Sequence, residues 1–108
     1  MEKSSTGLEA NIAGLLCYVL GWVSGLVFIL IEKDNKFVRF HAMQSIIVFG
    51  ALTIVSIIFS LIPFVGSVLS TILSLLGLVL WIVLMVKAYQ GTMYKLPWAG
   101  DLADKQVG

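Results

Sequence analysis

The chain has 108 residues, of which 59% are hydrophobic and 12% are charged, and its net charge is +1. Soluble domains average about 45–50% apolar and about 25% charged residues, so this composition points to a membrane protein. The small net charge and the singly spaced basic residues argue against nucleic-acid binding. A single cysteine excludes an intramolecular disulfide.

The first apolar run covers residues 12–31 and contains no charged side chain. Thr6 and Glu9 just before it have the spacing of a capping box. We therefore predict a helix over about residues 7–31, which is long enough to cross a bilayer once. The charged residues on both sides of the run favour a retained helix over a cleaved signal peptide.

The second apolar run, residues 42–86, lacks Asp, Glu, Lys, Arg and His throughout. At about 1.5 Å per helical residue it would extend roughly 67 Å, which is about two crossings of a 30 Å hydrocarbon core. We predict a cytoplasmic loop at 32–36, a helix over about 36–61 capped by Asp34 or Asn35, a turn at 62–66 and a helix over about 67–87. The tail, residues 88–108, contains Gly91, Pro97 and Gly100 and is expected to be irregular.

The expected fold is an all-α integral membrane protein, a single domain over residues 1–108. Its three transmembrane helices would pack as a small bundle, with the second and third forming a hairpin through residues 63–66. Three crossings place the termini on opposite sides, and the positive-inside rule puts the loop and the C-terminus in the cytoplasm and the N-terminus outside. The basic residues behind this assignment are Lys33, Lys36, Arg39, Lys87, Lys95 and Lys105 on one side, against Lys3 on the other.

Each predicted helix has one face of small or weakly polar residues. Gly21 and Gly25 form a GxxxG motif, which allows close backbone approach between helices in lipid. The simplest interpretation is helix packing, and the alternative is a weakly polar seam along an oligomer that a polypeptide or small solute could follow. The candidate packing residues are Gly14, Gly21, Gly25, Ser56, Ser60, Gly66, Ser70, Ser74 and Gly77.

The sequence offers little chemistry inside the membrane. Neither apolar run contains the carboxylates or basic groups that ion-coupled transporters use. One His and one Cys cannot form a metal site within one chain, and no phosphate-binding loop or hydrolase motif occurs. We expect no catalytic residues, no cofactor and no enzymatic activity.

His41 stands at the cytoplasmic mouth of the second predicted helix. As a structural residue it would hydrogen-bond a neighbouring helix end or a lipid headgroup. As a functional residue it could sense pH, because the unperturbed pKa of histidine is near 6.5. Arg39 is typical of a residue that anchors topology at the headgroups.

Three segments carry a family resemblance: FVRFHAMQS at residues 37–45, LGWVSG at 20–25, and KAYQG at 87–91 continuing to LPWAGD at 96–101. Together they resemble a family of small prokaryotic membrane proteins related to the twenty-kilodalton component of the translocon at the inner envelope of chloroplasts. The resemblance implies a protein-translocation component in the cell membrane of a prokaryote, with a polypeptide substrate. The residues that match its signature, and are therefore the functional candidates, are Arg39, His41, Gln44 and Ser45.

Three functions compete on this basis. The first is a translocation-type subunit that acts as an oligomer or within a larger complex. The second is a structural membrane module that packs against one dedicated partner and moves nothing. The third is a small-solute channel formed by an oligomer. In all three the lipid bilayer surrounds the chain, and the expected partners are further copies or another membrane protein.

Overall fold

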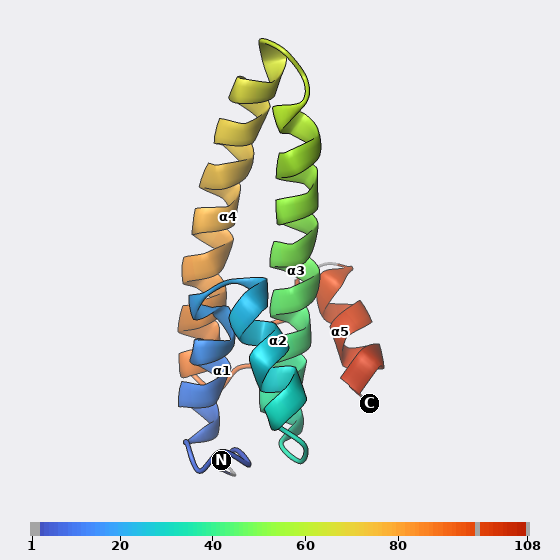
Figure 1. The fold of residues 1–108 in the computed structure, drawn as a ribbon. Helices are drawn as coiled ribbons and strands as arrows, with labels where there is room; N and C mark the ends of the chain where they lie inside the picture. The colour runs from blue at the N-terminus through green and yellow to red at the C-terminus, as the bar shows by residue number, and fades with distance from the viewer. Residues whose placement is uncertain (1–2, 97, 108) are drawn as a thin grey trace.

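The computed structural model describes residues 3–96 and 98–107, which form five helices. Their bounds are α1 (Ala10–Val19), α2 (Trp22–Ile31), α3 (Lys36–Ser60), α4 (Val65–Tyr89) and α5 (Ala99–Val107). The molecule is elongated, with extents of 49 × 22 × 22 Å. A long hairpin of α3 and α4 forms its axis, and the shorter α1, α2 and α5 surround one end of that hairpin (Figure 1). Pro97, one of the predicted tail breakers, lies outside the described residues.

The helices α3 and α4 are the two described helices long and apolar enough to cross a membrane. Each has 25 residues, or about 37 Å at 1.5 Å per residue. The side chain of Asn35 caps α3 by accepting a hydrogen bond from the backbone N–H of Val38 at 3.2 Å. At the turn Phe64 adopts a φ of 64°. Gly66 is required there because a Cβ would collide with the carbonyl oxygen of Phe59.

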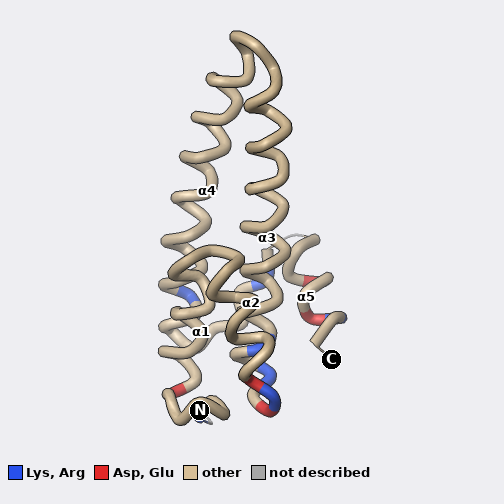
Figure 2. Tube along the Cα trace, viewed as in Figure 1, with Lys and Arg blue, Asp and Glu red and all other residues tan. Residues whose placement is uncertain are grey.

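The charged residues among those described all lie around one end of the molecule, and the distal half of the α3–α4 hairpin carries none (Figure 2). That half exposes large apolar side chains, among them Ile57, Phe64 and Ile72. An exposed apolar surface of this extent is stable in hydrocarbon and not in water. The hairpin is therefore built to stand in a membrane.

The prediction of one continuous helix over residues 7–31 is wrong, because this segment forms a short helical hairpin, and the expected single crossing is not confirmed. The chain turns back at Leu20 and Gly21, and α1 and α2 lie side by side along one half of α3 and α4 (Figure 1). Gly21 has φ 63° and ψ −136°, a conformation that glycine adopts without strain. The hydroxyl of Ser24 accepts from the Leu20 N–H at 3.1 Å and donates to the Cys17 carbonyl at 2.9 Å. Each helix has ten residues, or about 15 Å, which is half the thickness of a hydrocarbon core.

The start of α1 also differs from the prediction. Glu9 occupies the N-cap position of α1 but makes no side-chain capping bond, and Gly7 has a φ of 87°. The Thr6–Glu9 capping box is thus not formed. Residues 3–9 instead fold against the loop between α2 and α3, where Ser5 hydrogen-bonds the carboxylate of Glu32.

Both ends of the chain lie at the charged end of the molecule. The N-terminal segment contacts Glu32, and Asp104 of α5 pairs with Lys36 at the start of α3 at 3.6 Å. The structure does not confirm the prediction of termini on opposite sides of the membrane, because α1 and α2 fold back and both described ends lie at the same end of the molecule. The tail is not wholly irregular either, since its second half forms α5.

The core lies where α1 packs between α3 and α4. It consists of Ala10, Ala13, Cys17 and Tyr18 of α1, Val38 and Ala42 of α3, and Leu84 and Ala88 of α4. Half of these residues are alanines, which allow the three backbones to approach closely. Gly14 serves the same end, because a Cβ there would lie 2.9 Å from the ring of Phe37 and 3.4 Å from the Cβ of Ala88.

Candidate functional site

The four signature candidates lie on α3 and face the elements packed around its charged half. His41, Gln44 and Ser45 are fully buried, and Arg39 is partly buried. Each makes hydrogen bonds within the chain, so their partners define the site.

His41 joins α1 to the tail. Its Nδ1 lies 2.6 Å from the hydroxyl of Tyr18, and its Nε2 lies 3.0 Å from the carbonyl oxygen of Thr92. A carbonyl only accepts, so Nε2 carries the proton and the Tyr18 hydroxyl donates to Nδ1. The neutral histidine thus satisfies both of its ring nitrogens.

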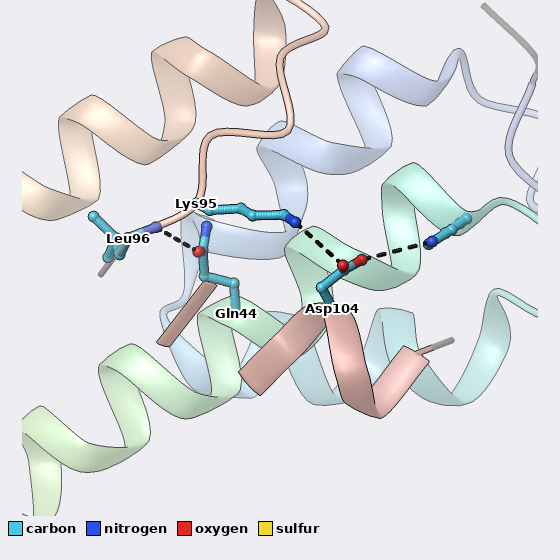
Figure 3. A network of polar contacts seen from close by, with 5 residues as sticks. Gln44, Lys95, Leu96 and Asp104 are labelled. Carbon is cyan, nitrogen blue, oxygen red and sulfur yellow. Dashed lines mark hydrogen bonds and ion pairs between the residues drawn. The ribbon is translucent and has the colours of Figure 1, made fainter. Parts of the chain in front are cut away.

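Gln44 completes this network. Its Nε2 donates to the Tyr18 hydroxyl at 3.1 Å and to the Tyr94 carbonyl at 2.9 Å, and its Oε1 accepts from the Leu96 N–H at 3.1 Å. Figure 3 shows the last of these bonds, between α3 and the tail segment that precedes α5. Every polar atom of the Gln44 amide group is engaged, so the side chain is fixed in one orientation.

Ser45 and Arg39 hold α2 against α3. The Ser45 hydroxyl donates to the carbonyl oxygen of Gly21 at 2.8 Å, at the turn between α1 and α2. Arg39 donates to the carbonyl of Glu32 at 2.6 Å and to that of Ile29 at 3.3 Å, which satisfies the C-terminal end of α2. Between them, Gly25 packs so closely that a Cβ would lie 2.7 Å from the Ala42 carbonyl oxygen.

Glu32 has a buried carboxylate and was not among the functional candidates predicted from the sequence. Its Oε2 accepts from the backbone N–H groups of Ser5 at 3.0 Å, Asp34 at 3.3 Å and Asn35 at 3.2 Å, and the hydroxyls of Ser4 and Ser5 also donate to the carboxylate. Burial by itself would raise the pKa of this carboxyl, but the hydrogen bonds from Ser4, Ser5 and Asn35 outweigh it and lower the pKa from 4.5 to about 2. Glu32 is therefore an ionised anchor for the N-terminal segment.

Two further residues of this region escaped the sequence analysis. Tyr18 is fully buried, and its carbonyl oxygen also accepts from the indole N–H of Trp81 at 2.6 Å. A tyrosine within an apolar run was the available signal, since a buried phenol needs a polar partner. Glu32 gave no such signal, because it stands in a charged cluster typical of a solvated loop.

The nine candidate packing residues lie in different surroundings. Gly14, Gly25 and Gly66 are buried at close contacts, whereas Gly21 forms a turn and is not part of a helical GxxxG face. Ser70 is half-buried on α4. The remaining four line a groove of about 420 Å³ between α3 and α4, and they are Ser56, Ser60, Ser74 and Gly77.

The groove opens in the charge-free half of the hairpin. Thr53 also lines it, together with apolar side chains such as Phe49 and Ile57. Across residues 3–96 and 98–107 no three His, Cys, Asp or Glu side chains gather in a way that could hold a metal ion. The groove presents hydroxyls and small residues, which are suited to contact with another helix.

Comparison with known proteins shows that the chain is similar to membrane proteins of archaea. It is 50% identical over 105 residues to a UPF0132 membrane protein of Methanocaldococcus jannaschii, covering 97% of this chain and 94% of the relative. A second UPF0132 membrane protein of that organism is 50% identical over 99 residues, covering 92% of this chain and 71% of the relative. One from Archaeoglobus fulgidus is 43% identical over 101 residues, covering 94% and 98%. No solved structure matches the chain.

The model of the magnetosome magnetite crystal formation protein family (MamF/MmsF) matches residues 4–103, and the chain belongs to this family. The resemblance to the chloroplast translocon component is therefore wrong, since the match over nearly the whole chain is to a different family. The short motifs behind that resemblance hold helices together within the chain, as the contacts of His41 and Gln44 show.

Proposed function

We propose that this member of the family is a non-enzymatic membrane interaction module that associates with a second copy of itself through the groove between α3 and α4. The observation that carries the proposal is the position of that groove. It lies in the half of the hairpin that no other described helix covers, and it gathers Ser56, Ser60, Ser74 and Gly77 from two helices.

The hydroxyls of the groove support a protein partner over lipid. Thr53 and Ser60 donate to carbonyls of their own helix, at 2.7 Å and 2.6 Å. Ser56 and Ser74 make no side-chain hydrogen bond to any described residue. A hydroxyl without a partner in hydrocarbon is unfavourable, and acyl chains offer no acceptor. A second helix offers both an acceptor and a close-packed surface.

A second copy is the partner that fits this groove best. Ser56 and Ser60 on α3 have the small-xxx-small spacing that favours close helix contacts, and Ser70 and Ser74 repeat it on α4. A twofold axis would bring the groove of one copy against the groove of the other. The serines of each groove would then contact the small residues of the partner's groove. One surface then serves both copies.

The signature residues favour a structural role over catalysis. His41, Gln44 and Ser45 direct their side-chain polar atoms to contacts inside the chain, and Arg39 does so through one guanidinium nitrogen. The family description concerns magnetite crystals, whereas the proposal for this chain rests on its membrane hairpin and needs no mineral chemistry.

We further propose that the charged end faces the cytoplasm of the cell membrane, with both termini inside. Every Lys and Arg of the chain belongs to that end or to the segments tied to it. The positive-inside rule assigns such an end to the cytoplasm. The α1–α2 hairpin would then enter the membrane from the cytoplasmic side and return after about 15 Å.

The test is the mass of the protein in lipid nanodiscs, measured by native mass spectrometry. The parent protein should give dimers, and the double variant Ser56→Leu with Ser74→Leu should give monomers, because two bulky side chains fill the groove. Val68→Leu is the matched control, since this position is exposed on α4 outside the groove. A parent protein that stays monomeric, or a double variant as dimeric as the control, would refute the proposal. Liposomes containing the dimer should leak no more than protein-free liposomes.

A further inference from the structure

The tail is held to α3 by a regular set of contacts. Residues 92–96, here named the arm, have no regular secondary structure and precede α5. His41 binds the carbonyl of Thr92, and Gln44 binds the carbonyl of Tyr94 and the N–H of Leu96. These backbone groups recur at every second residue of the arm. Two side chains of α3 thus hold the arm through its backbone.

Beyond the arm, α5 packs on α3 and on no other described helix. Its small residues Ala99, Gly100 and Ala103 are buried. Asp104 pairs with Lys36 at 3.6 Å and with Lys95 of the arm at 3.1 Å (Figure 3). The chain leaves α4, crosses α3 and ends on its far flank (Figure 1). The contacts of α5 with other helices therefore all lie on α3, and the arm adds one contact with α4, where the Lys87 Nζ lies 5.7 Å from the centre of the Tyr94 ring.

The unit formed by the arm and α5 is incompletely packed. An apolar cavity of about 230 Å³ lies between α3, α4 and the start of the unit, lined in part by Val55, Leu96 and Trp98. Trp98 remains 67% exposed. Buried interfaces within a domain are normally close-packed, so the attachment depends on the polar contacts more than on apolar burial.

The connection to α4 can change direction at one residue. Gly91 has a φ of 79°, and its N–H binds the Ala88 carbonyl at 3.0 Å while the Thr92 N–H binds the Lys87 carbonyl at 3.0 Å. This is the Schellman pattern that ends a helix at a glycine. Glycine is free to adopt other backbone conformations, so a rotation here would re-aim the arm without strain in α4.

We propose that two copies of this chain exchange their arms and α5 helices, so that His41 and Gln44 of each copy bind the arm of the other. This inference rests on the self-association proposed above. The exchanged contacts are the same as those within one chain, so exchange requires no new complementary surface and costs only the opening at Gly91. The partner copy would supply the backbone groups that complete the polar network of α3.

The experiment is disulfide trapping between two differently tagged chains, both carrying Cys17→Ala. One chain has Lys36→Cys and the other Asp104→Cys, and they are co-expressed, purified in nanodiscs and oxidised. The control pair is Ser5→Cys with Asp34→Cys, whose parent side chains are 3.3 Å apart on the same end of the protein but outside the exchanged unit. Exchange should give a covalent heterodimer of twice the chain mass for the first pair and none for the control.

The single chain carrying both Lys36→Cys and Asp104→Cys completes the test. If this chain forms only an intramolecular disulfide and the mixed chains form no disulfide with each other, the exchange is wrong. Native mass spectrometry of the unoxidised samples then distinguishes the two proposals. Dimers would refute only the exchange and agree with self-association, whereas monomers would refute both. Equal cross-linking of both mixed pairs would also overturn exchange, since it would reflect collisions between copies.

Discussion

The close contact of α2 with α3 at Gly25 predicts a large effect of Gly25→Ala. A Cβ at this position would lie 2.7 Å from the carbonyl oxygen of Ala42 and 3.0 Å from the Cβ of Ser45. Ordinary C···O contacts measure about 3.3–3.6 Å, so the overlap with the α3 backbone is at least about half an ångström. Backbone cannot rotate away as a side chain does, and α2 must therefore move off α3.

The magnitude follows from three contributions. Overpacking of this kind costs about 1–3 kcal/mol. Moving α2 also weakens the 2.8 Å hydrogen bond from Ser45 to Gly21, worth about 1 kcal/mol. Alanine offsets about 1 kcal/mol through its better helix propensity. The net expectation is a loss of about 1–3 kcal/mol in the free energy of unfolding.

Gly50→Ala is the matched control, because a Cβ there meets nothing within 4 Å. It should leave stability unchanged or raise it by up to about 1 kcal/mol. Both variants are compared by thermal unfolding in detergent micelles, where 1 kcal/mol corresponds to a shift of about 4–8 °C for a domain of this size. If Gly25→Ala unfolds at the same temperature as Gly50→Ala, α2 does not pack on α3 through this face and the hairpin arrangement is wrong.

Two further predictions concern the charged end. Ser5→Cys and Lys105→Cys, each in the Cys17→Ala background, should react with a membrane-impermeant maleimide from the same side of sealed vesicles, and labelling from opposite sides would contradict the α1–α2 hairpin. Because the pKa of Glu32 falls from 4.5 to about 2 on folding, its ionised form should stabilise the fold above pH 4.5 by about 1–3 kcal/mol, and this contribution should disappear as pH falls toward 2. Proteolysis of the N-terminal segment with an acid-stable protease should report the loss, and Glu32→Gln should be cut at a rate that varies little over that range.

The long hairpin was predictable because its signals are local. A run of 45 residues without a charge leaves few structures other than membrane helices. Asn35 also had the right side chain at the right place to cap α3. Both inferences depend only on residue types and their order, and so they needed no knowledge of what packs against what.

The α1–α2 hairpin was not predictable in the same way. A glycine in an apolar run is compatible with a contact between helices and equally with a turn. The GxxxG spacing of Gly21 and Gly25 favoured the helix contact. The turn is stabilised by two hydrogen bonds to its backbone: the Leu20 N–H donates to the Ser24 hydroxyl, and the Gly21 carbonyl accepts from the Ser45 hydroxyl. Ser45 is 24 residues away in sequence, so no local pattern contains this information.

The order of the signature residues along α3 gives the reason for their spacing. Irregular backbone within a membrane persists only where protein groups satisfy it. Arg39, nearest the charged end, binds the last carbonyls of α2, and Ser45, about two helical turns deeper, binds the carbonyl at the turn. The two residues thus secure the bottom and the top of the same ten-residue helix. His41 and Gln44 lie between them and hold Tyr18 of α1 and the arm. A helix that crossed the membrane fully would need none of these bonds, because its backbone would satisfy itself. The spacing of the signature residues on α3 therefore follows from the bonds that hold the short α1–α2 hairpin against that helix.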